Sequence, residues 1–148
     1  MFRVDGETLE ISMVNEDFDK PNGITFSPDE SVLYVGDTGR TNGEFRPHNL
    51  MAFDVVGGSL ENPRLFAKVD PHVPGGFRAD VNGNIWVAAG DGVQIFNPAG
   101  DLLGKIHTPE VAVNLSFGMS DEQTLFIGAT SSIWSIELNI AGATRPTY

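Results

Sequence analysis

The sequence predicts an all-β protein built from many short strands. Short segments rich in Val, Ile, Leu, Phe and Trp alternate with turns, for which the 148-residue chain supplies 17 glycines and 9 prolines. No segment repeats apolar residues at positions i, i+3, i+4 and i+7 over three turns, so no long helix is expected. Because 41% of the residues are hydrophobic, the chain can also bury a core.

One hairpin pattern occurs three times along the chain. Each copy has a start that is small or contains Asn, then an apolar strand, a polar turn and a second apolar strand. The copies are PNGITFSPDESVLYVGDT at 21–38, PGGFRADVNGNIWVAA at 74–89 and VNLSFGMSDEQTLFIGA at 113–129. Matching Leu33 with Ile85 and Leu125 gives spacings of about 52 and 40 residues, as expected for propeller blades. A polar, glycine-rich loop at 39–48 lengthens the first interval.

A second hairpin follows each of the first two copies, so each complete unit has the four strands of a propeller blade. We therefore expect a β-propeller fragment of about three four-stranded blades in a single half-propeller domain. Its parts are the outer strands of a preceding blade at 1–20, blades at 21–70 and 74–108, and an incomplete blade at 111–140.

Open sheet edges are a liability that proteins normally cover. We therefore expect this half to be completed into a six-bladed ring by another chain. That chain would be a second copy, giving a homodimer, or a missing N-terminal half. The sequence itself is expected to be either a natural short protein or a truncated one.

The net charge of the chain limits the kinds of partner that it can bind. Nine basic and 20 acidic residues give a formal net charge of -11, which repels phosphate backbones and anionic membrane surfaces. No apolar run approaches the roughly 20 residues of a membrane span, and the N-terminus lacks the pattern of a secretory signal. We expect a cytoplasmic protein that binds neither nucleic acid nor membrane, although its start is open to truncation.

The sequence lacks several familiar catalytic motifs. It has no cysteine, which excludes disulfides, thiolate catalysis and Cys-based zinc sites, so any metal ligands are oxygens or imidazoles. It also has no serine nucleophile elbow, no phosphate-binding Walker loop and no H-E-x-x-H helix.

The order of three stretches resembles the C-terminal half of the gluconolactonase and regucalcin (senescence marker protein) family. They are DKPNGITFSPDESVLYVGDTG, then the segment from HNLMAFDVV to DLLGKI, and VNLSFGMSDEQTLFIGATSSIWSIEL. The resemblance implies a six-bladed propeller that hydrolyses small sugar lactones, which makes it a carboxylic ester hydrolase. It also implies a divalent metal ion, with Ca²⁺ favoured and Zn²⁺, Mg²⁺ and Mn²⁺ as alternatives.

The resemblance also implies where the metal lies. In that family a Glu, an Asn and an Asp hold the cation in the central channel, where it polarises the lactone carbonyl. Asn22 in Pro21-Asn22-Gly23 matches the family's Asn, and its amide oxygen suits such cations. Taken alone, Pro-Asn-Gly is more simply an ordinary turn signal. The Glu lies in the half that the sequence does not contain.

The family's Asp, which is also its candidate general base, falls on Gly75 in Pro74-Gly75-Gly76. A glycine offers neither a carboxylate ligand nor a proton acceptor, so the catalytic residue is left unknown. Asp70 and His72 precede this position, and they would replace the Asp if the local backbone turned them inward. A solvated loop is the simpler interpretation of both.

Other polar residues also accompany the blades. Asn114 starts the third blade and is a candidate for contact with substrate or the metal shell, with a buried amide bonded to backbone as the alternative. His48 and Arg46 are candidates for the substrate-binding lining of a channel mouth. Asp37 is expected to tie neighbouring blades by accepting backbone N–H bonds.

Two functions from different classes follow. The first is a metal-dependent sugar-lactone hydrolase assembled from half-propeller chains, with its activity impaired by Gly75. The alternative is a non-catalytic propeller fragment or pseudoenzyme that serves as a small-molecule binding or assembly module.

Overall fold

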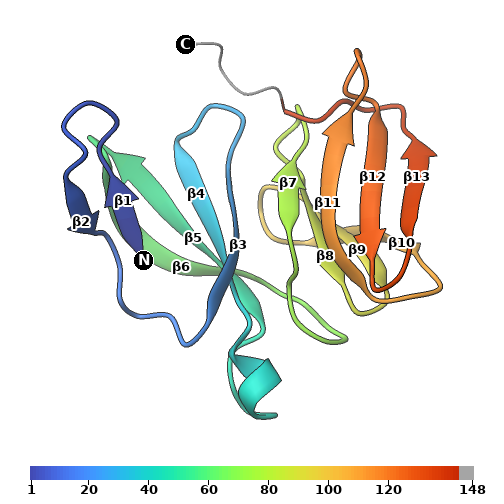
Figure 1. The fold of residues 1–148 in the computed structure, drawn as a ribbon, viewed down its shortest axis with the longest axis horizontal. Helices are drawn as coiled ribbons and strands as arrows, with labels where there is room; N and C mark the ends of the chain where they lie inside the picture. The colour runs from blue at the N-terminus through green and yellow to red at the C-terminus, as the bar shows by residue number, and fades with distance from the viewer. Residues whose placement is uncertain (144–148) are drawn as a thin grey trace.

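A computed structural model of the protein describes residues 1–143 and shows an all-β fold of four antiparallel sheets, as the sequence predicts (Figure 1). The first sheet is a hairpin of β1 (Phe2–Val4) and β2 (Ile11–Met13). The second holds β3 (Pro21–Phe26), β4 (Val32–Asp37), β5 (Asn49–Val56) and β6 (Ser59–Lys68). The third holds β7 (Phe77–Ala79), β8 (Ile85–Ala89), β9 (Gly92–Phe96) and β10 (Leu102–His107). The fourth holds β11 (Ala112–Gly118), β12 (Thr124–Ala129) and β13 (Ile133–Glu137).

The sheets follow one another like blades around an axis. Within each of the three larger sheets the strands pair in chain order, and the first strand of each lies innermost (Figure 1). β3 contacts β7 and β7 contacts β11, so the three inner strands stand side by side. This is the arrangement of propeller blades, in which inner strands surround a central channel.

The hydrophobic core lies between the faces of successive sheets. One cluster joins the second and third sheets and includes Tyr34, Leu50 and Phe77, while another joins the third and fourth sheets around Trp86 and Leu125. β8 is covered on both faces, and all five of its residues are buried. Its uninterrupted apolar run, IWVAA, is what a strand buried on both faces requires.

In the second and third sheets, an aspartate stabilises the turn between the first two strands: Asp29 between β3 and β4, and Asp80 between β7 and β8. These turns lie at the opposite end of the blades from the inner-strand starts. Asp29 accepts hydrogen bonds from the hydroxyls of Ser27 (2.6 Å) and Ser31 (2.8 Å). These bonds lower the pKa of Asp29 to about 2. Asp80 is fully buried, and its carboxylate accepts bonds from the backbone of Asn82 and Asn84, the Asn84 amide and the Trp86 indole. Asp80 thus fixes both its own turn and a core tryptophan.

The last described residues return to the middle of the molecule. Val81 donates its N–H to the carbonyl of Ala141 (3.0 Å), and Ala143 donates to Ala79 (3.0 Å). Gly142 forms an isolated antiparallel bridge with Asp80. This segment therefore covers the end of β7 that is opposite the start of the blade. Residues 144–148 of the expected tail lie outside the described residues.

The loop between β4 and β5 contains the 3-10 helix η1 (Gly39–Asn42), which is the only helix in residues 1–143. The sequence predicts a non-strand loop here, and the remainder of the loop is irregular. No helix in this range is long and apolar enough to cross a bilayer.

Candidate functional site

The starts of the three inner strands meet at one place, which we call the channel mouth: Asn22, Gly23, Gly75, Gly76, Val113 and Asn114. A Cβ atom added to Gly23 would lie 2.5 Å from the carbonyl oxygen of Gly75. The N–H of Gly76 donates to the carbonyl of Val113 at 2.9 Å. Segments about 50 and 40 residues apart in sequence are therefore in direct contact here, as the repeat pattern predicts.

Asn22 is exposed at the channel mouth, and its side chain makes no hydrogen bond within residues 1–143. An unpaired amide supplies an oxygen acceptor and an N–H₂ donor to a ligand. Of the candidate groups at the mouth, Asn22 is therefore the one whose amide oxygen is open for binding.

Asp37 fixes the segment that leads to Asn22. Its buried carboxylate accepts N–H bonds from Asp19 (2.9 Å), Lys20 (3.0 Å) and Gly39 (2.9 Å). The carboxylate thus ties the linker between the first two sheets to the second sheet, which is the role expected of it. Charge-assisted bonds of this kind are stronger than neutral ones.

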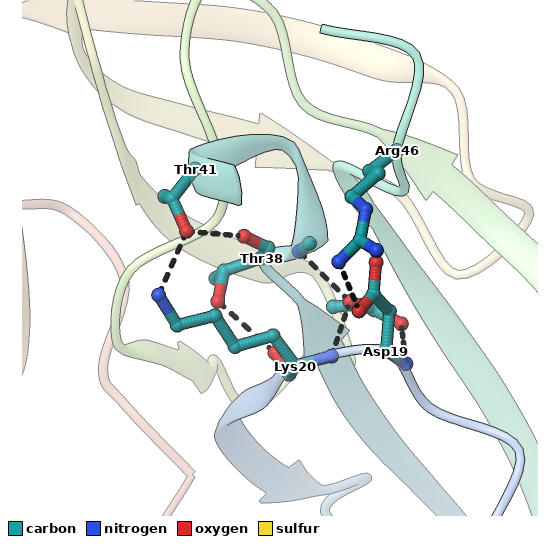
Figure 2. Close-up of polar contacts among 7 residues, drawn as sticks. Asp19, Lys20, Thr38, Thr41 and Arg46 are labelled. Carbon is teal, nitrogen blue, oxygen red and sulfur yellow. Dashed lines mark hydrogen bonds and ion pairs between the residues drawn. The ribbon is translucent and has the colours of Figure 1, made fainter. Parts of the chain in front are cut away.

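A second set of contacts ties the same segment to η1 and its loop (Figure 2). Lys20 Nζ donates to Thr41 Oγ1 (2.8 Å), which donates in turn to the Thr38 carbonyl (2.9 Å). Thr38 Oγ1 donates back to the carbonyl of Lys20 (3.0 Å). The two residues before Pro21 are thus held on both sides, and this limits the freedom of Asn22.

Arg46 forms an ion pair with Asp19 at 2.9 Å and belongs to the same set of contacts (Figure 2). Its side chain is 51% exposed, so solvent weakens this pair. The guanidinium is therefore engaged in holding the 39–48 loop against the linker. Sequence reasoning placed Arg46 near a channel mouth but did not identify its acidic partner.

Gly75 is enclosed by backbone. Its N–H donates to the carbonyl of Ala88 (2.8 Å), and a Cβ added to it would overlap the carbonyl oxygen of Val113. A side chain at position 75 therefore requires β11 or the 74–76 backbone to move. The resemblance showed that Gly75 replaces the family's Asp. It could not show that the Val113 carbonyl occupies the space where a side chain at position 75 would begin.

Asn114 is exposed, and its Oδ1 accepts the N–H of Leu115 at 2.9 Å. It is thus bonded to backbone without being buried. The preceding segment is fixed by Glu110, whose carboxylate accepts bonds from the Ser131 N–H (2.7 Å) and the Ser132 hydroxyl (2.9 Å). The bonds from the Ser131 backbone and the two serine hydroxyls lower the pKa of Glu110.

His48, Asp70 and His72 lie beside the channel mouth in the loops. His48 is half-buried, and its carbonyl accepts the N–H of Val69 (3.0 Å). Asp70 forms an ion pair with Arg40 at 2.8 Å and is 69% exposed. His72 lines an open hollow of about 350 Å³ with Arg40 and Thr41. Asp70 is thus paired with Arg40, whereas His72 is exposed beside this hollow.

Three residues that the sequence did not single out hold the loop before Gly75. Gln94 Nε2 donates to the carbonyl of Asp70 (2.9 Å) and to Asp91 Oδ1 (2.9 Å), and Lys105 forms an ion pair with Asp91 (2.7 Å). Burial works to raise the pKa of Asp91, but the bonds from Lys105 and Gln94 and the Lys105 charge hold it below the ordinary value. No sequence motif marks this set, because Asp91 lies in the turn before β9, Gln94 on β9 and Lys105 on β10.

The residues present do not make a complete cation site. No group of three or more His, Cys, Asp or Glu side chains lies close enough within residues 1–143 to hold a metal ion. The side chains of the channel mouth offer two amide oxygens, on Asn22 and Asn114, and that of Asn114 already accepts one backbone N–H. A divalent cation takes six or more oxygens or a compact set of charged ligands.

The protein matches known sequences along most of its length. Residues 1–131 match the family described as SMP-30/Gluconolactonase/LRE-like region. A lactonohydrolase of Aspergillus oryzae is 30% identical over 96% of this chain and 34% of its own length. A gluconolactonase of Zymomonas mobilis is 27% identical over 89% of this chain and 38% of its own length. The chain therefore spans little more than a third of these relatives.

Solved structures agree with the fold. The gluconolactonase of Xanthomonas campestris is 36% identical, with a TM-score of 0.84 over 93% of this chain and 44% of its own. A calcium-binding regucalcin from Agrobacterium tumefaciens is 21% identical, with a TM-score of 0.72 over 93% of this chain and 51% of its own, and supports the fold alone. From its sequence match and its blades, this chain belongs to the SMP-30/gluconolactonase/LRE-like family.

Proposed function

We propose that this chain forms about half of a lactone-hydrolysing propeller. The observation that carries the proposal is the channel mouth, where three inner-strand starts meet and an unpaired Asn22 amide faces open space. The family match over residues 1–131 and relatives named as gluconolactonase and lactonohydrolase support the reaction class. A small sugar lactone is the proposed substrate.

Metal dependence is part of the proposal, with Ca²⁺ as the favoured ion. Asn22 would contribute one amide oxygen, and the carboxylates would come from the region that completes the ring. The six residues of the channel mouth carry no carboxylate or imidazole, so the group that takes a proton from water must also come from outside them. What these residues do themselves is bind and orient a polar ligand.

Strand counts bear on what completes the ring. The two interior sheets have four strands, whereas β1–β2 has two and β11–β13 has three. A second copy placed by two-fold symmetry would join two strands to three and give five-stranded blades. A complementary region that adds two strands to the β1–β2 hairpin and one strand beside β13 gives every one of these sheets four strands. We propose such a complementary region, equivalent to an N-terminal half, over a homodimer.

The proposal is tested on the completed ring, with this chain joined to the complementary region, by following acid release from glucono-δ-lactone with Ca²⁺, Zn²⁺, Mg²⁺ or Mn²⁺ added in turn. We expect a rate above the spontaneous one that depends on the metal and falls at least about tenfold in Asn22→Ala. Asn62→Ala, an exposed amide on β6, is the control and should keep the full rate. A rate equal to buffer with every metal contradicts the proposal.

A specific observation favours the second candidate function. Gly75 is closed over by the Val113 carbonyl, so the mouth lacks the carboxylate that the family resemblance places there. A non-catalytic module that binds a sugar-like ligand fits this closed position. Binding of lactone without hydrolysis at any metal concentration would identify it. The cytoplasmic location expected from the sequence stays a prediction.

A further inference from the structure

A backbone donor fixes the orientation of the Asn114 amide. The N–H of Leu115 requires an acceptor, so the atom 2.9 Å from it is Oδ1 and the other end of the amide is Nδ2. The side chain of Asn114 makes no other hydrogen bond within residues 1–143, and the residue is exposed. Its two N–H groups are therefore free to donate at the channel mouth.

The Gly75-Gly76 step shapes the space in which this amide lies. A Cβ added to Gly76 would overlap Oδ1 of Asn114 and lie 2.5 Å from its Cγ. The Gly76 N–H also holds the carbonyl of Val113, the residue before Asn114. Two residues without side chains let β11 approach this closely, and the amide then rests directly on the backbone.

The two amides of the mouth differ in what they offer. The Asn22 side chain makes no hydrogen bond within residues 1–143, whereas Asn114 accepts the Leu115 N–H on Oδ1 and keeps a free N–H₂ group. Neither residue is charged, and the glycines between them add no side chain. Around Asn114 the mouth thus offers a hydrogen-bond donor to a ligand oxygen that accepts a hydrogen bond.

We propose that Asn114 is a substrate-orienting residue that donates a hydrogen bond from Nδ2 to a carbonyl or hydroxyl oxygen of a lactone ring, and that Gly75-Gly76 holds it in that role. The inference rests on the proposed function and names the part of the site that recognises the ring. It assigns Asn114 to substrate and not to the metal shell. One neutral hydrogen bond changes affinity by roughly 3- to 10-fold.

The direct test uses gluconolactam, the amide analogue of glucono-δ-lactone, which resists hydrolysis. In the full ¹⁵N-labelled chain, we expect the Asn114 side-chain N–H₂ signals to shift as lactam is added. The side-chain N–H₂ group of Asn62 lies away from the mouth and donates to Asp54 at 2.8 Å, so its signals should stay in place. Asn114 signals that do not move at saturating lactam, or the absence of any lactam binding, would overturn the proposal.

The Asn114→Asp substitution distinguishes a hydrogen-bond donor to substrate from a metal ligand at this position. The substitution keeps an oxygen for Leu115 but replaces the N–H₂ group with a second carboxylate oxygen. We expect lactam affinity to fall by roughly 3- to 10-fold and calorimetric Ca²⁺ affinity to rise. Lactam affinity equal to that of the wild type would contradict the inference. Gly76→Ala, which displaces the amide, should lose affinity similarly while its circular dichroism spectrum stays that of a folded chain.

The inference and the proposed function fail in different ways. Lactam binding that shifts Asn114, with no hydrolysis by the completed ring in any metal, supports the inference and contradicts the lactonase proposal. Hydrolysis whose KM is unchanged in both Asn114→Asp and Gly76→Ala supports the lactonase and contradicts the inference.

Discussion

Strands β8 and β13 carry similar sequences, IWVAA and IWSIE, and differ completely in their surroundings. All five residues of β8 are buried between neighbouring sheets, and all five of β13 are exposed. Trp86 is 7% exposed and bonds the buried Asp80, whereas Trp134 is 42% exposed and bonds Ser132. Whether a strand of this fold is buried therefore depends on the sheets that lie beside it. An Ile-Trp pair in the sequence does not by itself distinguish a buried strand from an exposed one.

Between interior and edge sheets, the largest expected difference in the free energy of unfolding comes from replacing a phenylalanine. Phe77 is fully buried between the second and third sheets, whereas Phe2 on the first hairpin is 68% exposed. We expect Phe77→Ala to lower the free energy of unfolding by about 3–5 kcal/mol and Phe2→Ala by under about 1 kcal/mol. Urea denaturation measures both. Equal losses would show that the interior sheets are no better packed than the edge.

Two hairpin aspartates give a sharper version of the comparison. Asp80 is fully buried and accepts four hydrogen bonds, while the exposed Asp121 at the corresponding turn of the fourth sheet accepts one from the Gln123 N–H (3.1 Å). We expect Asp80→Ala to cost about 2–3 kcal/mol, because buried donors lose their acceptor, and Asp121→Ala under about 0.5 kcal/mol. Tryptophan fluorescence should report a changed Trp86 environment in Asp80→Ala only. A spectral change of the same size in Asp121→Ala would contradict this assignment.

The pH dependence of stability should also reside partly in the third sheet. The folded pKa of Asp91 lies below the ordinary value of 3.8, so its stabilising contribution is present above that value. The contribution is lost as the pH falls through the lowered folded pKa. We expect Asp91→Asn to be less stable than the wild type at pH 7 and to lose less on acidification to pH 2. Parallel melting curves against pH for the two proteins would refute this.

The smallest effect is expected at the open edge. Ile136 on β13 is 39% exposed and Trp134 beside it is similarly open. Ile136→Ser should change the free energy of unfolding of this chain by at most about 0.5–1 kcal/mol. The same substitution should weaken the proposed pairing with a complementary strand. A loss above about 2 kcal/mol in the isolated chain would mean that β13 is already covered.

The sequence predicts the blade fold and the anchoring role of Asp37 correctly, because strands and turns depend on residues close together in sequence. The hairpin repeat located the meeting inner strands, and Asp37 was expected to accept backbone N–H bonds, as it does. The closure of Gly75 by Val113 and the Arg46–Asp19 pair were not predictable. Both depend on the distance between segments remote in sequence, which no local pattern encodes.

The central claim is that the three inner-strand starts form one ligand-binding mouth. Mapping backbone amide shifts of the labelled chain during gluconolactam titration tests it most directly. The account predicts shifts concentrated at 22–23, 75–76 and 113–115, with little change at the opposite turns, 80–84 and 119–123. Shifts centred on those turns, or on the separate hollow beside Asn15 and Phe18, would contradict it.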